Sequence, residues 1–186
     1  MKISTTVIWY NPDNKNIENI KTYLNYFEKL FIIDNSQNNN KGLVEILEST
    51  KVEYIYNKEK NLGIASALNL VCEKSIKEGF SWILTMDQDS YFDSKNVEEY
   101  LKTFSQIENK NIGIVSPCHI LKNDIVKMDE DKKFMDVDRV MTSGNLLNLS
   151  AWKKVGKFDE NLFIDEVDNE MCYRMIEKGY QIKQLN

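Results

Sequence analysis

Residues 82–90 read Trp-Ile-Leu-Thr-Met-Asp-Gln-Asp-Ser, and the rest of the chain is organised around them. An apolar run of strand length ends in two carboxylates, Asp87 and Asp89, separated by one residue. Strands buried in a parallel sheet are nearly continuous apolar runs, and ligands gather at their carboxyl ends. Because alternate side chains of an extended chain share a side, we expect both carboxylates to face one cleft. Their repulsion predicts a divalent metal ion, completed by a phosphate-bearing substrate.

Two other interpretations of this acidic pair are compatible with its spacing. A lone Asp-x-Asp is as often a turn in which the carboxylates bond backbone amides. The spacing from Asp87 to Glu98 also imitates a calcium-binding loop, with acidic residues at several of its ligand positions. That loop needs a glycine where Phe92 stands, and a helix rather than a buried strand before it, so we reject it.

The first 86 residues alternate between strand and helix patterns. Strands are predicted at 3–10, 30–33, 52–56 and 80–86, with helices between them, the first over residues 15–29. This order predicts an α/β fold with a mainly parallel central sheet and helices on both faces. Asp34 and Asp87 each end a predicted strand, so we expect them at the same edge of the sheet.

The second half continues the pattern less regularly. A helix is predicted near 97–107 and a strand at 112–116, followed by a long excursion over the cleft at 117–140. His119, the only histidine, lies in this excursion and has no evident partner in the sequence. A strand, a short helix, the acid-rich run 165–170, a helix and a last strand complete the chain. No repeat or linker interrupts residues 1–186, which predicts a single domain.

Composition limits the classes of function. The chain has 186 residues, 42% of them hydrophobic, and a net charge of -5, which indicates a globular protein and argues against a general nucleic-acid binder. Three widely spaced cysteines favour a reducing, cytoplasmic location. The chain begins without a signal-peptide pattern, and no apolar run approaches the roughly 20 residues of a membrane span.

Six segments in order resemble glycosyltransferase family 2, most closely its bacterial rhamnosyltransferase-like members. They are 7–12 (Val-Ile-Trp-Tyr-Asn-Pro), 32–36 (Ile-Ile-Asp-Asn-Ser), 61–69 (Asn-Leu-Gly-Ile-Ala-x-Ala-Leu-Asn), 82–90, 143–145 (Ser-Gly-Asn) and 163–174 (Phe-Ile-Asp-x-Val-Asp-x-Glu-x-Cys-x-Arg). Each segment is weak evidence alone, and the resemblance rests on their combination over nearly the whole chain.

The resemblance implies a single Rossmann-like GT-A domain and an inverting transfer from a nucleoside-diphosphate sugar. The expected donor is dTDP- or UDP-linked, with rhamnose mildly favoured, and the expected acceptor is a glycan or lipid-linked glycan. The implied cofactor is Mg²⁺ or Mn²⁺, held by Asp89 with Asp87. The implied nucleotide-sugar residues are Tyr10, Asn11, Asp34, Asn35, Asn61, Gly63, Asp87 and Gln88. Asp168 falls at the position of the catalytic base, and Gly144, Asn145 and Arg174 on the side of the acceptor and sugar.

The same resemblance divides the chain into a nucleotide-sugar half, 1–90, and an acceptor half, 91–186. Family members usually continue past the position of Asn186, often with a histidine near the metal, so the second half is expected to be C-terminally truncated or short. Peripheral contact with the inner face of the cell membrane would suit a lipid-linked acceptor. The oligomeric state is not predicted.

Two alternatives remain open at this point. A truncated or non-catalytic sugar-nucleotide-binding domain would share most of these residues. A sugar nucleotidyltransferase would share the sheet and the acidic pair, but it would normally carry a glycine-rich, basic phosphate loop after the first strand. This chain has Tyr10-Asn11-Pro12-Asp13 at that position, which makes the nucleotidyltransferase the weaker alternative.

Overall fold

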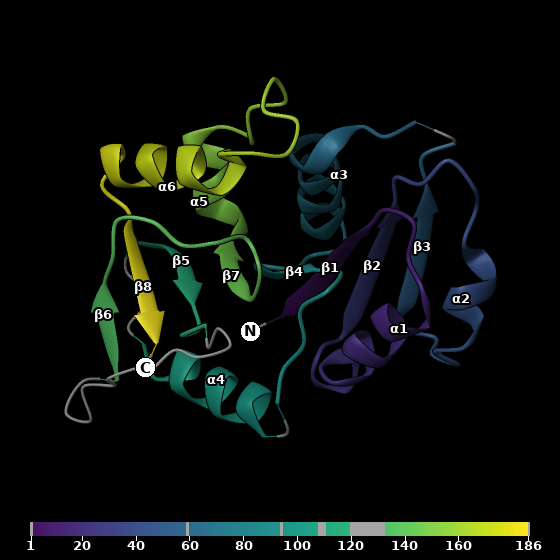
Figure 1. Ribbon diagram of the computed structural model, residues 1–186. Helices are drawn as coiled ribbons and strands as arrows, with labels where there is room; N and C mark the ends of the chain where they lie inside the picture. Colours follow the sequence, from purple (N-terminus) through teal and green to yellow (C-terminus); the bar gives the residue numbers. More distant parts are fainter. Residues whose placement is uncertain (1, 59, 94, 108–110, 120–132, 186) are drawn as a thin grey trace.

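A computed structural model describes residues 2–58, 60–93, 95–107, 111–119 and 133–185. Its centre is one eight-stranded sheet with the strand order β3-β2-β1-β4-β7-β5-β8-β6 (Figure 1). The strands are β1 (Ile3–Trp9), β2 (Lys29–Asp34), β3 (Val52–Tyr56), β4 (Trp82–Asp87), β5 (Ile112–Ser116), β6 (Phe134–Asp136), β7 (Asn145–Asn148) and β8 (Gln181–Leu185). Neighbouring strands are parallel except for β7, which is antiparallel to β4 and β5, and β6, which is antiparallel to β8.

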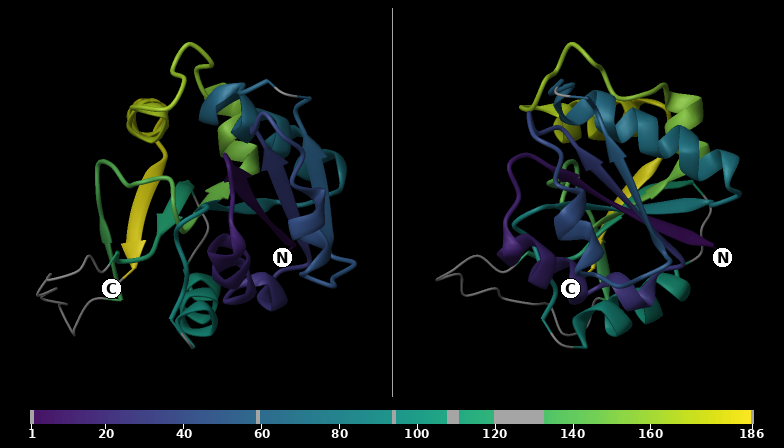
Figure 2. Two further views of the ribbon diagram at one scale, coloured as in Figure 1. Left: turned by 45° about the vertical axis from the view of Figure 1, so that its right-hand side comes forward. Right: turned by 90° about the vertical axis from the view of Figure 1, so that its right-hand side faces the viewer.

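Helices cover both faces of this sheet (Figures 1 and 2). They are α1 (Asn14–Lys21), a 3₁₀ turn (Leu24–Tyr26), α2 (Lys41–Glu45), α3 (Gly63–Lys77), α4 (Asn96–Ser105), α5 (Leu149–Val155) and α6 (Val167–Glu177). One face packs against α1, α2 and α4, and the other against α3, α5 and α6. The predicted α/β fold with a mainly parallel sheet is therefore confirmed.

The two-sided burial explains why the strands read as continuous apolar runs. In β4, Trp82, Leu84 and Met86 belong to the core under α1 and α4, whereas Ile83 belongs to the core under α3 and α5. All four side chains are at most 4% exposed. In a strand with only one buried face, apolar residues would alternate with polar ones.

Two local expectations differ from the structure. The helix expected at 15–29 ends at Lys21, because Thr22 caps it and the chain then turns through the 3₁₀ segment into β2. The excursion at 117–140 contains β6, which pairs with β8 at the sheet edge. Sequence periodicity missed β6 because it is only three residues long and all three are exposed. Residues 120–132 of that excursion lie outside the described part of the chain.

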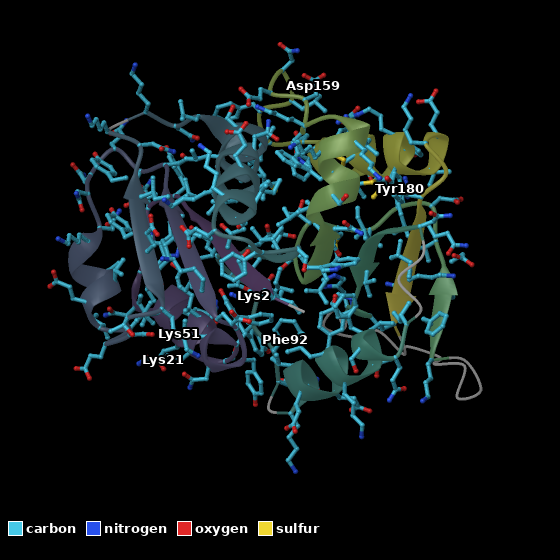
Figure 3. All side chains as sticks on the ribbon, turned by 180° about the vertical axis from the view of Figure 1, so that it is seen from behind. Lys2, Lys21, Lys51, Phe92, Asp159 and Tyr180 are labelled. Atoms are coloured by element: carbon cyan, nitrogen blue, oxygen red, sulfur yellow. The ribbon has the colours of Figure 1, made fainter. Side chains whose placement is uncertain are left out.

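The segment after the acidic pair is held in place by Phe92, which Figure 3 shows at the α4 side of the molecule. Its backbone N–H donates to Thr22 Oγ1 at 3.1 Å, and its ring packs between those of Tyr23 and Tyr100. This aromatic contact positions the chain between β4 and α4, which forms one wall of the site described below. In the part of the chain that the structure describes, no helix is long and apolar enough to cross a membrane.

Candidate functional site

The carboxyl ends of β1, β2 and β4 meet at one edge of the sheet, as the sequence predicts. Trp9 pairs with Asp34, and Ile8 pairs with Asp87, in two parallel ladders. Asp34 and Asp87 therefore flank the end of β1, where Tyr10 is half-exposed and Asn11 adopts a left-handed conformation with φ 51°. Asn11 donates its N–H to Ser36 Oγ at 2.7 Å, which ties the two loops together.

Asp34 organises the loop that follows β2. Its carboxylate accepts hydrogen bonds from the N–H of Ser36 at 2.9 Å, from Asn40 N and Nδ2 at 3.2 and 3.0 Å, and from the Tyr54 hydroxyl at 2.6 Å. Burial alone would raise the pKa of this carboxyl, but these donors outweigh burial and leave the pKa below its ordinary value. Asp34 is therefore a fully buried anion that shapes the wall of the edge.

The start of α3 forms the next part of this wall. Asn35 donates from Nδ2 to the carbonyl of Gly63 at 3.1 Å, and Asn61 Oδ1 accepts the N–H of Gly63 at 2.9 Å. Gly63 has φ +77°, and a Cβ built on it would lie 2.5 Å from the carbonyl oxygen of Phe163. That carbonyl accepts the N–H of Ile64 at 2.7 Å. The predicted Asn61–Gly63 segment is thus joined to the loop before α6.

Gln88 fastens the acidic turn to the neighbouring strand and helix. Its side chain accepts from Tyr10 N at 2.8 Å and donates to Tyr10 O at 3.2 Å. Its backbone carbonyl accepts from the side-chain amides of Asn16 and Asn19 at 2.8 and 3.1 Å. Sequence reasoning missed both asparagines. The signal in the sequence was their spacing of three residues on α1, which places both side chains next to each other beside the apolar face of the helix.

Two carboxylates, Asp89 from the same turn and Asp168 from α6, act on the charge of Asp87 at the end of β4. The pKa of Asp87 is raised to about 6, first by desolvation within the site and then by the negative charges of Asp89 and Asp168. The N–H of Asp87 donates to Ser143 Oγ at 3.2 Å. Within the described residues, neither Asp87 nor Asp89 has an ion pair with Lys or Arg. The repulsion that raises the pKa would be relieved by a cation, so the pair fits a divalent metal ion.

The protein alone supplies few ligands for such an ion. No group of three or more His, Cys, Asp or Glu side chains placed to hold a metal is found among the residues that the structure describes. Mg²⁺ is commonly bound by one or two carboxylates together with substrate phosphates and water. Asp87 and Asp89 would therefore need a phosphate-bearing substrate to complete the coordination of the ion. The sequence predicts this arrangement.

Asp168 lies in the first turn of α6 and is held by the segment before β7. Its Oδ2 accepts the N–H of Thr142 at 3.0 Å, with Thr142 Oγ1 at 3.4 Å, and its Oδ1 accepts the N–H of Asn169 at 2.8 Å. Glu166, immediately before the helix, has φ 63°. The carboxylate of Asp168 is therefore held beside the segment before β7, and its negative charge acts on Asp87.

Gly144 and Asn145 have structural contacts next to the site. Gly144 has φ +79°, and its N–H donates to Thr85 O at 2.7 Å. A Cβ there would lie 2.7 Å from Pro117, so only glycine fits. Asn145 is 5% exposed and donates from Nδ2 to Met141 O at 2.6 Å. Gly144 lines the cavity described next, whereas Asn145 lies beneath it at the start of β7.

Arg174 does not lie in the cleft. Its guanidinium pairs with Glu170 one turn earlier and donates to the carbonyls of Gly156 at 3.1 Å and Lys157 at 2.8 Å. These contacts fasten the end of α5 to α6. The expectation that Arg174 contacts sugar or acceptor is therefore not carried into the function proposed below, because its donors are used within the protein.

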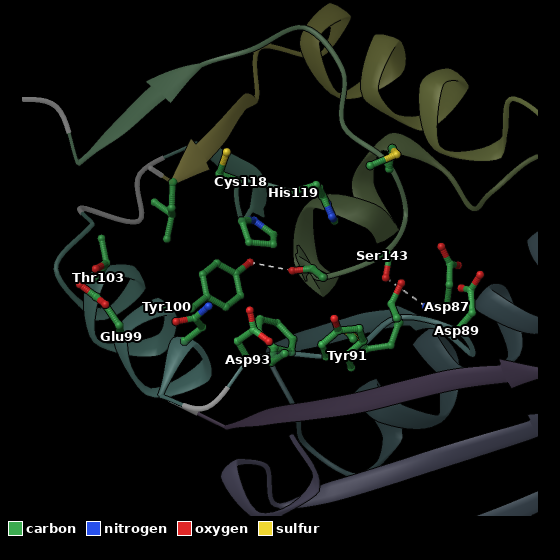
Figure 4. A pocket seen from close by; sticks show the side chains of 18 residues that line it. Asp87, Asp89, Tyr91, Asp93, Glu99, Tyr100, Thr103, Cys118, His119 and Ser143 are labelled. Atoms are coloured by element: carbon green, nitrogen blue, oxygen red, sulfur yellow. Dashed lines mark hydrogen bonds between the residues drawn. The ribbon is translucent and has the colours of Figure 1, made fainter. Parts of the chain in front are cut away.

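A cavity of about 500 Å³ extends from the acidic pair toward α4 (Figure 4). Its size falls within the range of small-molecule sites in proteins. Besides Asp87 and Asp89, its wall includes His119, whose side chain points into the cavity in Figure 4. Sequence reasoning found no partner for His119, since only the fold brings the end of β5 beside the segment at 141–144. The lining residues are Met86, Asp87, Asp89, Ser90, Tyr91, Phe92, Asp93, Asn96, Glu99, Tyr100, Thr103, Pro117, Cys118, His119, Met141, Ser143, Gly144 and Leu185.

Comparisons with known proteins identify the family of this chain. A model of the family described as glycosyl transferase family 2 matches residues 14–159. The chain is 27% identical over 194 residues to a protein named dTDP-rhamnosyl transferase RfbF from Shigella flexneri. That alignment covers 95% of this chain but 64% of the relative, so the chain spans less than two thirds of the relative's length.

The fold also matches a solved structure. The crystal structure of GalNAc-T7 with UDP, GalNAc and Mn²⁺ superposes with a TM-score of 0.78, covering all of this chain and 42% of that one. The sequence identity is 11%, so this likeness speaks for the GT-A fold alone. The family model covers most of the chain and includes the acidic pair at the end of β4. The chain therefore belongs to glycosyl transferase family 2.

Proposed function

We propose that this chain is a glycosyltransferase that moves a sugar from a nucleoside diphosphate to a hydroxyl of a glycan acceptor, with inversion at the anomeric carbon. The observation that carries the proposal is the convergence of Asp87, Asp89 and Asp168 at the end of β4, in a chain of this family. The name of the Shigella flexneri relative supports dTDP-rhamnose as the donor.

The nucleotide-sugar half is proposed to be residues 1–90. Tyr10 and Asn11 at the end of β1, and Asn61 before α3, form exposed parts of this edge, with Gly63 buried behind Asn61. Asp34, Asn35 and Gln88 act mainly by holding the loops around it, because their side chains are engaged in the bonds described above.

Asp89 and Asp87 would hold Mg²⁺ or Mn²⁺. When bound, the ion offsets the charge on the leaving diphosphate. The raised pKa of Asp87 supports this role, because a cation restores the ionised form that neighbouring carboxylates disfavour.

Asp168 is proposed as the general base. It accepts the proton of the acceptor hydroxyl while that oxygen forms a bond to the anomeric carbon and the bond from that carbon to the diphosphate breaks. The N–H of Thr142 holds Oδ2 of Asp168 in place for this transfer. A single displacement requires no protein nucleophile.

Residues 91–186 are proposed to form the acceptor side of a single domain. A lipid-linked glycan, met through peripheral contact with the inner face of the membrane, is the acceptor that we propose for the whole protein. The three cysteines are unpaired in the described part of the chain, which supports the proposed cytoplasmic location.

Thermal unfolding with dTDP, UDP or GDP, each in Mn²⁺, Mg²⁺ or EDTA, tests the donor site. A ligand at about 100 times its Kd stabilises the folded state by about 2.7 kcal/mol, which corresponds to a Tm increase of roughly 5–10 °C for a protein of this size. We expect a metal-dependent increase with dTDP. Asp89→Ala should remove it, and the matched control Asp165→Asn, at an exposed carboxylate before α6, should retain it. No metal-dependent shift with any of the three nucleotides would contradict the proposed function.

A further inference from the structure

The charged side chains that line the cavity beside α4 are mainly negative. Four carboxylates line it: Asp87 and Asp89 at one end, Asp93 after the acidic turn, and Glu99 on α4 (Figure 4). Among the lining residues that the structure describes, none is a lysine or an arginine. A divalent ion on the first two would leave Asp93 and Glu99 as fixed negative charges. A carboxylate or phosphate entering this space would meet like charges, which disfavour binding.

The rest of the wall offers apolar surface that is held in position. Phe92 is held by Thr22 and stacks on Tyr100, with ring centroids 6.1 Å apart. The Tyr100 hydroxyl lies 2.7 Å from the carbonyl of Val115 and 2.9 Å from that of Gly144, so it is already used by the protein. Tyr91 is exposed at the mouth of the cavity. Rigid rings beside carboxylates suit a sugar, which has both C–H faces and hydroxyl donors.

His119 adds an unused hydrogen-bonding group to this wall. Its Nε2 is buried and has no hydrogen-bond partner among the residues that the structure describes. Burial lowers the pKa of the ring, against an opposing contribution from the backbone of Ser143, so the ring is neutral at pH 7. A neutral ring with its proton on Nδ1 presents Nε2 as an acceptor. A buried acceptor without a partner costs free energy, and a ligand hydroxyl beside His119 would remove that cost.

We propose that this cavity binds an uncharged or amine-bearing sugar of the acceptor, that His119 Nε2 accepts a hydrogen bond from one of its hydroxyls, and that sugars carrying a carboxylate or phosphate are rejected. The proposal rests on the proposed function, and it narrows the acceptor to a chemical class. Asp168 supports the placement, because it accepts the N–H of Thr142, and Met141 and Ser143 on either side of Thr142 line the cavity.

Saturation-transfer NMR titrations with methyl glycosides test the charge rule. Two matched sets each vary the charge by a single change at C2 or C6 of the same ring: glucose, glucosamine and glucuronic acid, and galactose, galactosamine and galacturonic acid. They are measured with Mg²⁺, with and without dTDP or UDP. We expect the neutral or amino member of a set to bind at least about ten-fold more tightly than the acid. The variant with Asp93→Asn and Glu99→Gln should reduce that difference. Glu98→Gln, a neighbouring carboxylate on α4 that does not line the cavity, should leave it unchanged.

The role of His119 is tested separately, by the sugar affinity of two variants. His119→Ala should weaken binding of the neutral sugar about 2- to 10-fold, as expected for one lost hydrogen bond, while the Kd for nucleotide and Mg²⁺ stays the same. His119→Gln, which keeps an acceptor, should recover part of the loss. Equal loss in both variants, or an unchanged affinity in His119→Ala, would overturn this role.

The outcomes separate the two proposals. Uronic acids that bind as well as the neutral sugars would overturn the charge rule. Nucleotide binding without any sugar binding would overturn the cavity as the acceptor site while leaving the donor site intact. Sugar binding that follows the charge rule, without nucleotide binding at any metal, would count against the proposed function instead.

Discussion

Replacing Gly63 by alanine should destabilise the protein far more than the same change at a comparable glycine. Gly63 has φ +77°, and its Cβ would lie 2.5 Å from the Phe163 carbonyl oxygen and 2.8 Å from the Phe163 ring. Gly79, just after α3, has φ +83° with no atom within 4 Å of a Cβ. Both substitutions place alanine in the left-handed region, which costs about 1–2 kcal/mol. Gly79→Ala therefore measures the cost of the left-handed backbone conformation without a steric clash.

The additional cost at Gly63 comes from two contacts. Forcing a methyl group into occupied space costs about 1–3 kcal/mol. Moving the Phe163 carbonyl also strains its hydrogen bond from Ile64 at 2.7 Å, and such a bond contributes about 0.5–1.5 kcal/mol. We expect Gly63→Ala to be less stable than Gly79→Ala by about 2–4 kcal/mol, which is roughly 4–16 °C in Tm at this chain length.

Urea unfolding and thermal melts of the two variants, measured without ligand, check this difference. Equal destabilisation would refute the reasoning, because it would mean that the α3 start and the Phe163 loop separate at no cost. A larger destabilisation by Gly63→Ala would instead indicate that the contact between the start of α3 and the loop before α6 contributes to stability.

Three further predictions concern the site carboxylates and Arg174. Asp168→Asn should lower transfer by about 10²–10⁴-fold, the usual contribution of a general base, while metal-dependent nucleotide binding in the thermal assay is retained. The pKa of Asp87, about 6, exceeds that of an unfolded aspartate, so stability without metal should fall as pH rises from about 4 to 6. Asp87→Asn should then raise Tm more at pH 7 than at pH 5, and an equal effect at both would contradict the assigned pKa. Arg174→Met should cost about 1.5–3 kcal/mol in urea unfolding, because Glu170 and two carbonyls lose donors, with nucleotide affinity unchanged. A weaker nucleotide affinity at full stability would place Arg174 in the site after all.

The sequence alone was sufficient for the architecture. Continuous apolar runs in β2 and β4, separated by helix-forming segments, have few solutions other than a sheet buried on both faces. It was also sufficient to place Asp34 and Asp87 on one edge, because parallel strands put their carboxyl ends together. β6 escaped prediction because three exposed residues carry no periodic signal.

Roles that depend on distant contacts needed the tertiary structure. Arg174 closes the acidic motif at 163–174 in the sequence, yet the α5–α6 contact uses its guanidinium. His119 looked isolated until β5 and the segment before β7 brought it to the cavity wall. The coupling of Asp168 to Asp87 spans 81 residues of chain and exists only after the sheet has formed. The succession of strands and helices along the chain follows from the local hydrophobic pattern, whereas hydrogen bonds and pKa values depend on which side chains the fold places within a few ångströms of one another.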